Sequence, residues 1–303
     1  MTARVLVLGG SGFIGSAVVQ ALLRRGAETR TSPAPRLNAV TALDAAECAR
    51  HARARPELHV MLDWANVVVN TAGLSDAGSC EESELNAANA AMPAMIARLA
   101  RDAGVQRFLH VSSAAVQGDR LVLDSSEDMQ PFSPYSRSKA LGERLLLDLG
   151  WPGLVLYRPQ GVHGPGRQVT RSLTRLARSP LASVAAPGDQ PTPQAPVANV
   201  ADATAFLALT QRTPPRIVLH PWEGLTTASL LQHLGGRRPV RIPAVCARYI
   251  VAALRTVGRR HPRTAANARR VQMMWFGQAV EPSWMTDAGW RPVTDLLMGV
   301  ATC

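Results

Sequence analysis

The segment VLVLGGSGFIGS, residues Val5–Ser16, constrains the fold of this chain more than any other feature. An apolar run leads into glycines at every third position, and helical periodicity continues over Gly12–Arg25. Glycine suits a tight strand-to-helix turn, and the free N–H groups at a helix N-terminus attract phosphate. We therefore expect a turn that binds the pyrophosphate of a dinucleotide, with contacts from Gly9, Ser11, Gly12, Phe13, Ile14 and Gly15.

Short apolar runs alternate with helical patterns through the first half of the chain. We expect strands over residues 27–32, 67–70, 108–112 and 153–157, and helices over residues 83–103 and 134–149. This alternation predicts an α/β fold with a doubly wound parallel sheet. Beyond about residue 160, loops rich in glycine and proline interrupt the pattern. The predicted division is a dinucleotide-binding core over residues 1–160 and a smaller, partly interleaved substrate-binding part over 161–303, with residues 196–210 returning to the core.

The end of the second predicted strand bears on the choice of dinucleotide. An acidic residue usually stands there to bind the adenosine ribose. Here the sequence reads SPAPR, with no carboxylate, and Ser32 and Arg36 are suited to a 2′-phosphate. This favours NADP over NAD. We expect Leu43 and Asp44 to contact the adenine, and the cofactor to lie beside Thr71, Ala72 and Gly73.

Lys139, in the segment SPYSRSKA, is the only lysine of the chain, and every other strongly basic side chain is arginine. Ser133 is suited to cap a helix that has Pro134 at its first position. Tyr135 and Lys139 are four residues apart and share a face of that helix. An ammonium about 4 Å from a phenol favours the phenolate by up to about 4 kcal/mol at an effective dielectric of about 20, which brings a pKa of about 10 near 7. Tyr135 then suits proton transfer, and an ammonium fits two ribose hydroxyls better than a planar guanidinium does.

With these residues in place, the chain resembles an extended short-chain dehydrogenase/reductase of the NAD(P)-dependent epimerase/dehydratase family. The resemblance rests on GGSGFIG, NTAG, Asn89, HVSSAAVQG, PYSRSK, YRPQGVHGPG, PVANVADA and DAGWRP, and covers nearly the whole chain. It implies a Rossmann-type fold in which Ser113 hydrogen-bonds the reacting oxygen, Tyr135 transfers the proton, and Lys139 holds ribose. It also implies that Arg158 and Pro159 line the nicotinamide pocket.

Several positions depart from the family pattern. Ala114 and Ala115 replace the acidic pair of the sugar dehydratases, so we expect no dehydratase activity. Gln117 and His163 stand where tyrosine is usual, and Gly161 replaces an asparagine that contacts nucleotide-sugar phosphate. Arginines at helical spacing are one replacement for that phosphate contact, and a solvated helix face is the other interpretation. We assign the substrate side to Ser113, Gln160, Arg167 and Arg171, with Arg175 as a further arginine of the same row.

The chain carries an excess of basic residues, with a net charge of +11 and a pI near 10.9. Ten arginines lie between Arg237 and Arg270. Nucleic acid or an acidic membrane suits such a segment, but the sparse aromatic residues and the bias toward alanine, arginine and proline favour a solvated face. Within it, Val240–Gly258 is apolar, with an arginine at every seventh position. This suits a helix lying on a membrane or one covering the substrate pocket, and we favour the pocket helix, which the family has.

The remaining composition excludes several classes of site. The four cysteines form no CxxC pair, and the seven histidines are scattered, so we expect neither a disulfide framework nor a metal site. Met1–Arg4 leads directly into a short apolar run, Val5–Leu8, too short for a signal peptide or membrane span. We therefore expect a cytoplasmic protein.

Together these features predict an NAD(P)-dependent enzyme that acts at a hydroxyl or keto carbon of a sugar, most readily a nucleotide-activated one. Reduction of a 4-keto sugar and 4-epimerisation both fit Ser113, Tyr135 and Lys139, and the sequence leaves that choice open. The alternatives are an NADPH-dependent reductase of a non-sugar carbonyl and a non-catalytic protein that binds NADP or nucleic acid. We expect a homodimer, with neither nucleic acid nor a membrane as the favoured partner.

Overall fold

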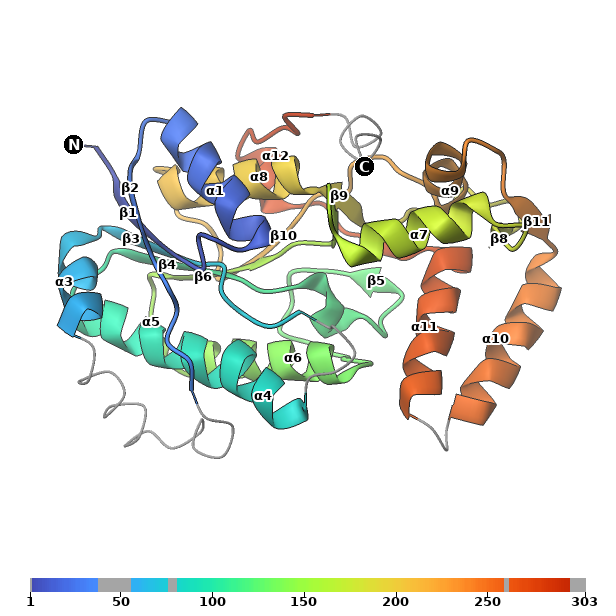
Figure 1. The fold of residues 1–303 in the computed structure, drawn as a ribbon, viewed down its shortest axis with the longest axis horizontal. Coiled ribbons are helices and arrows are strands. Elements are labelled where there is room, and N and C mark those ends of the chain that lie inside the picture. The colour runs from blue at the N-terminus through green and yellow to red at the C-terminus, as the bar shows by residue number, and fades with distance from the viewer. Residues whose placement is uncertain (1, 38–55, 76–80, 259–261, 295–303) are drawn as a thin grey trace.

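The computed structural model describes residues 2–37, 56–75, 81–258 and 262–294. Its centre is a six-stranded sheet in the order β10-β6-β4-β3-β1-β2, and every neighbouring pair in it is parallel (Figure 1). The predicted α/β fold with a doubly wound sheet is confirmed. In chain order the strands are β1 (Arg4–Leu8), β2 (Glu28–Ser32), β3 (Val67–Asn70), β4 (Arg107–Val111), β6 (Leu154–Arg158) and β10 (Ile217–Leu219).

Helices cover both faces of this sheet. One layer is formed by α1 (Phe13–Arg24), α8 (Val197–Leu209) and the short α12 (Trp284–Asp287). The other layer is formed by α3 (Pro56–Trp64), α5 (Met92–Asp102) and α6 (Pro134–Leu147). Successive residues of a strand point to opposite faces, so Val5 and Val7 pack in the first layer while Leu6 and Leu8 pack in the second. Both faces of β1 are therefore apolar and buried.

The helix predicted over residues 83–103 contains a wider turn. It consists of α4 (Glu82–Asn86), a π-helical turn η1 (Ala87–Ala91) and α5, which follow one another without a break. α6 crosses this turn closely, since a Cβ on Gly142 would lie 2.1 Å from the Asn89 backbone oxygen. Such single π turns often accompany functional sites.

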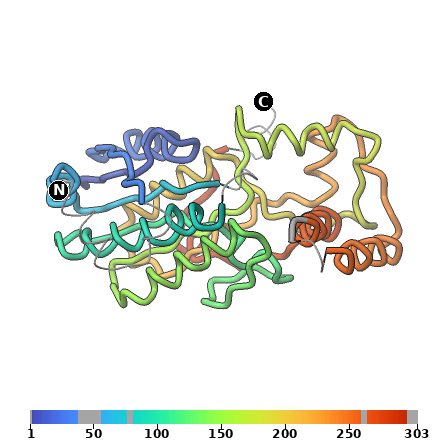
Figure 2. The backbone as a smooth tube through the Cα atoms, turned by 60° about the horizontal axis from the view of Figure 1, so that its bottom comes forward, coloured from blue at the N-terminus to red at the C-terminus, as the bar shows by residue number. Residues whose placement is uncertain are grey.

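Outside the central sheet, the described residues form three two-stranded parallel ladders, and further helices lie in the C-terminal part of the chain. β5 (Val122–Leu123) pairs with β12 (Ala279–Val280), β7 (Gly161–His163) with β9 (Gln194–Pro196), and β8 (Ser183–Ala185) with β11 (Val240–Ile242). These helices are α7 (Gln168–Arg178), α9 (Thr227–Gly235), α10 (Ala244–Gly258) and α11 (Pro262–Phe276). Figure 2 shows α10 and α11 at the end of the molecule far from the N-terminus. Of the helices that the structure describes, none has the length and apolar character needed to cross a membrane.

Candidate active site

The glycine-rich turn joins β1 to α1 at the carboxyl edge of the sheet. Gly9 has a positive φ of 78°, and a Cβ on it would lie 2.8 Å from the Ala72 backbone nitrogen. A Cβ on Gly15 would lie 2.0 Å from the Gly9 oxygen. Both positions therefore require glycine, one for its conformation and contact and the other for close packing of helix on turn.

The N-terminus of α1 is open to a ligand. Gly12 caps this helix and offers no side chain for its N–H groups, and Ser11, Gly12 and Phe13 are exposed. Ile14 is half-buried against the core. An uncapped, accessible helix N-terminus fits the pyrophosphate of a dinucleotide, both through its N–H groups and through the helix dipole.

The end of β3 lies beside this turn. The Thr71 hydroxyl donates to the Leu8 carbonyl at 2.7 Å, and the Ala72 N–H donates to the Asn70 side chain at 3.1 Å. Asn89, from the π turn, accepts from the Leu74 N–H and donates to the Leu74 carbonyl and to Ser138 of α6, each at 3.0 Å. Asn89 thus fixes the segment after Gly73 against the helix that carries Tyr135 and Lys139.

The adenosine end of the predicted cofactor site lies at the end of β2. Ser32 pairs in register with Leu8, and its hydroxyl donates to the Pro33 carbonyl at 3.3 Å. Arg36 is exposed. Leu43 and Asp44, the expected adenine contacts, lie outside the described residues.

Tyr135 and Lys139 stand in the first turns of α6, which begins at a capping box. The Ser133 and Ser136 side chains each accept a hydrogen bond from the other residue's backbone N–H, and this fixes the start of the helix. Tyr135 is half-buried, whereas Lys139 is 5% exposed and donates to the Val111 carbonyl at 3.3 Å. Burial lowers the pKa of Lys139 to about 8, against the opposing charge of Glu143.

Ser113 is held two residues beyond the end of β4. Its hydroxyl accepts from the Ala115 N–H at 3.1 Å and caps η2 (Ala114–Gln117). The Ala114 N–H donates to the carbonyl of Pro159, which is buried at the end of β6. The bond from Lys139 to Val111 and the position of Ser113 place both residues at the carboxyl end of β4, where open α/β sheets bind ligands.

Beneath Lys139 lies a buried ion pair that the sequence did not predict. Arg158 and Glu143 are both fully buried, with Nη2 and Oε2 2.6 Å apart. The Ser112 hydroxyl donates to Glu143 at 2.5 Å. The sequence placed Arg158 along the nicotinamide pocket; in the structure its guanidinium donates to Glu143 and to the carbonyls of Asp124 and Ser126. The available signal was Glu143, one helical turn after Lys139 on the same face of α6.

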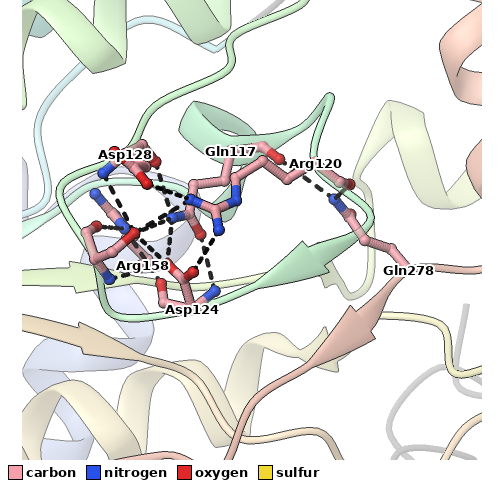
Figure 3. Close-up of polar contacts among 7 residues, drawn as sticks. Gln117, Arg120, Asp124, Asp128, Arg158 and Gln278 are labelled. Carbon is pink, nitrogen blue, oxygen red and sulfur yellow. Dashed lines mark hydrogen bonds and ion pairs between the residues drawn. The ribbon is translucent and has the colours of Figure 1, made fainter.

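The loop from β4 to α6 is held by a polar network centred on Gln117, which is fully buried (Figure 3). The Gln117 amide donates to Asp124 at 2.7 Å and accepts from the Asp124 N–H at 3.0 Å. Asp124 also pairs with Arg120 at 2.6 Å. Arg158 donates into the same loop, to the Ser126 carbonyl at 2.8 Å, and Gln278 donates to the Arg120 carbonyl at 2.8 Å. Where the family usually has tyrosine, this chain has an amide that organises the loop.

The arginines predicted for the substrate side differ in where they lie. Arg167 is half-buried, with its guanidinium carbon 5.1 Å from the centre of the Phe13 ring, and its Nη1 atom is buried without a hydrogen-bond partner. Burial lowers the pKa of Arg167, and the neighbouring charge of Tyr135 opposes that shift. Arg171 is exposed and donates to the Gly166 carbonyl at 2.8 Å, and Arg175 is exposed as well. Arg167 is thus the member of this row that contacts the glycine turn, through Phe13.

The β7–β9 ladder explains two departures from the family pattern. The Gln194 side-chain oxygen accepts from Nε2 of the buried His163 ring at 2.6 Å, and the Thr170 hydroxyl contacts the other ring nitrogen at 3.1 Å. Burial lowers the pKa of His163, as does the charge of Arg167, while the bond to Gln194 raises it. A Cβ on Gly161 would lie 2.0 Å from the Gln194 side-chain oxygen. An asparagine at 161 would therefore require Gln194 to move.

Gln160 lies next to this ladder and is buried. Its amide nitrogen donates to the His220 carbonyl at 2.8 Å, while its side-chain oxygen is buried without a hydrogen-bond partner. Among the described residues, no group of three or more histidine, cysteine or acidic side chains has an arrangement able to hold a metal ion.

Comparison with known proteins identifies relatives of this chain. A curated relative, the 4-hydroxy-2-methyl-3-oxo-4-farnesyl-3,4-dihydroquinoline-1-oxide ketoreductase of Stigmatella aurantiaca, is 32% identical over 173 residues, 53% of this chain and 51% of that protein. The UDP-glucose 4-epimerase of Neisseria meningitidis serogroup C is 31% identical over 186 residues, 54% of this chain and 55% of that protein. The chain thus spans about half the length of these relatives.

A solved structure, the dTDP-4-dehydrorhamnose reductase from Bacillus anthracis in complex with NADP, has the same fold. It superposes with a TM-score of 0.63 at 16% identity, over 100% of this chain and 97% of that one. The model of the NAD dependent epimerase/dehydratase family matches residues 5–218, which include the glycine turn, Ser113, Tyr135 and Lys139. The chain therefore belongs to the NAD dependent epimerase/dehydratase family.

Proposed function

We propose that this protein is an NAD(P)-dependent enzyme acting at a hydroxyl or keto carbon of a nucleotide-activated sugar, by 4-keto reduction or 4-epimerisation. The observation that carries the proposal is the buried ammonium of Lys139, hydrogen-bonded to Val111, one turn along α6 from Tyr135. An isolated buried lysine is costly, and a site that uses its charge accounts for it. The names of the relatives, a UDP-glucose epimerase and a dTDP-keto-sugar reductase, support the substrate class.

A dinucleotide held at the glycine turn between β1 and α1 would supply the hydride chemistry of this mechanism. The Ser113 hydroxyl positions the sugar oxygen, and Tyr135 takes or gives the proton of that oxygen. Lys139 would stabilise the Tyr135 phenolate by its charge and would bind the ribose hydroxyls of the dinucleotide. Glu143 and Arg158 hold the helix and the strand end together beneath them, so that these groups keep their positions.

We assign the contact with the anionic part of the substrate to Arg167. Its buried Nη1 atom has no hydrogen-bond partner, and the guanidinium carbon lies 5.1 Å from the centre of the Phe13 ring at the glycine turn. A phosphate oxygen satisfies such a group well. Arg171, exposed and turned to Gly166, is the matched residue that we do not expect to bind it.

Inhibition by nucleoside diphosphates tests this assignment. We expect UDP or dTDP to compete with substrate, and Arg167→Ala to weaken that inhibition by about 1.5–3 kcal/mol, the range for hydrogen bonds to charged groups. Arg171→Ala should leave the inhibition constant near that of the wild type. If neither nucleotide binds at millimolar concentration, the nucleotide-sugar assignment is wrong.

A reductase of a non-sugar carbonyl is the second candidate. It is favoured by the apolar side chains exposed on α10 and by the relative whose name describes a farnesylated quinoline ketone.

The cofactor content of the purified protein distinguishes epimerisation from reduction. Cofactor that stays bound through purification supports epimerisation, whereas exchangeable NADPH supports reduction.

A further inference from the structure

The outward face of α10 is apolar and exposed. The helix packs on α11 through Ala247, Val251 and the region of Gly258, where a Cβ would lie 2.8 Å from the Ala265 backbone. On the side turned away, four large apolar side chains are exposed: Val245 (60%), Tyr249 (74%), Ile250 (42%) and Val257 (60%). Cys246, Ala252, Ala253 and Thr256, which are also exposed, add no charge to this face.

Arginines lie along one edge of this face, and acidic residues are absent from its segment. The sequence has no aspartate or glutamate between Glu223 and Glu281, while ten arginines lie between Arg237 and Arg270. Arg248 and Arg255 are exposed and, at seven residues apart, lie along one edge of the apolar face of α10. Arg241 is exposed just before the helix. An apolar stripe bordered by arginine side chains is the pattern of a helix lying in a membrane interface.

One acidic group from the body of the protein contacts the helical pair. Asp119, in the loop after Ser113, accepts from Arg255 at 2.9 Å and lies 3.3 Å from the Arg269 guanidinium. Arg269 also donates to the Gly118 and Arg120 carbonyls. These contacts hold α10 and α11 to the loop that follows the catalytic serine, and leave the apolar face of α10 turned outward.

A second copy of this chain fits the face poorly. A helix of 15 residues is about 22 Å long and about 10 Å wide, so its outer face offers about 200 Å², well below the roughly 800 Å² per partner of a stable interface. Two copies meeting through this face would also bring arginines together, and like charges repel. An anionic lipid surface, by contrast, accepts both the apolar stripe and the arginines.

We propose that the apolar face of α10, with Arg241 and Arg248 beside it, docks this protein onto anionic membrane surfaces. At about 22 Å the helix is shorter than the roughly 30 Å hydrocarbon core, so it lies in the interface and does not span it. Figure 1 shows α10 and α11 side by side at the end of the molecule away from the N-terminus. This inference is independent of the proposed reaction.

Vesicle sedimentation of the full chain tests the proposal. We expect the protein to sediment with vesicles of equal parts phosphatidylcholine and phosphatidylglycerol, to bind much less to phosphatidylcholine alone, and to be released by high salt. Tyr249→Glu should lower the partition coefficient by on the order of tenfold or more, because it places a charge in the apolar face. Arg248→Gln should lower it less, and only for the anionic vesicles.

Val60→Glu is the matched control, because Val60 is a 65% exposed apolar residue on a helix of the core layer. It should sediment as the wild type does, and all three variants should bind NADPH normally, which shows that they fold. The proposal is overturned if the wild type does not sediment with anionic vesicles, or if Tyr249→Glu sediments equally well. It is also overturned if the face binds a second copy of the chain. In that case the wild type would form a dimer without binding vesicles, and Tyr249→Glu would dissociate that dimer.

Discussion

Lys139 combines two opposing requirements at the scale of a single residue. Burial favours its neutral amine and lowers its pKa to about 8, while its proposed role needs the ammonium. The Val111 carbonyl and the nearby Glu143 carboxylate favour the charged form. The ammonium is therefore retained at neutral pH by a small margin, and this makes the residue sensitive to both substitution and pH.

Lys139→Arg should fold but lose most of its turnover, by at least about a hundredfold with UDP-glucose or a keto-sugar as trial substrate. The substitution keeps a positive charge, yet a guanidinium fork fits neither the ribose hydroxyls nor the compact space beside Val111. NADPH titration and initial rates measure the two effects separately. Near-wild-type turnover in this variant would remove the proposed reason for the lysine.

Cofactor affinity should fall as the pH rises through about 8, because the folded-state pKa of Lys139 lies there and the neutral amine no longer stabilises the bound state. The stability contribution has the opposite sign. Between about 8 and the ordinary value of 10.5, the unfolded chain binds more protons at this residue, so its contribution to the free energy of unfolding rises with pH. Fluorescence titration of NADPH and urea unfolding over this window measure both trends. A flat affinity profile would contradict the assignment.

Arg36 is expected to select the phosphorylated cofactor. Because SPAPR lacks a carboxylate and Arg36 is exposed four residues beyond the end of β2, we expect NADPH to bind more tightly than NADH. Arg36→Ala should reduce that preference without changing NADH affinity, as measured by titration with each cofactor. An unchanged preference means that Arg36 does not contact the 2′-phosphate.

At the scale of elements, the Glu143–Arg158 pair joins α6 to β6. Both side chains are fully buried, so removing one charge leaves the other without a partner in the interior. Glu143→Gln should lower the free energy of unfolding by about 3–5 kcal/mol in urea denaturation. Glu82→Gln is the control, because it breaks the exposed pair between Glu82 and Arg137 and should cost about 0–1 kcal/mol. Equal effects in the two variants would show that burial is not what makes the first pair important.

At the scale of the whole molecule, the sequence predicted what local patterns determine. The parallel sheet followed from the alternation of elements, and β3 was predicted to the residue over Val67–Asn70. Contacts between distant segments were not predictable in the same way. Gln117 meets Gln278, and Arg158 meets Glu143, only after strands and helices have been placed in space. Likewise, spacing alone predicted Arg167 and Arg171 equally as substrate contacts. In the structure Arg167 caps the start of α7, while Arg171 lies within the helix and donates to the Gly166 carbonyl.

The division of the chain at residue 160 and the homodimer stay predictions. The fold does show how the two halves share elements, since β10 completes the edge of the central sheet and α8 packs on α1. The Asn89 and Gln117 contacts, which sequence reasoning did not assign, both fix loops around the candidate site. The sequence singled out Asn89 through the family resemblance and Gln117 as a departure from it, but it did not indicate which distant groups their amides contact.

Asp119 connects the loop after Ser113 with α10 and α11, and this contact can couple binding at the two places. It stands six residues after Ser113 and holds arginines from both α10 and α11. If substrate shifts the position of this loop, and a lipid surface shifts that of the helical pair, each ligand alters the affinity of the other by one and the same factor. A sugar nucleotide that weakened sedimentation with vesicles would then itself bind more weakly to the lipid-bound protein, and Asp119→Asn would bring that reciprocal factor toward one.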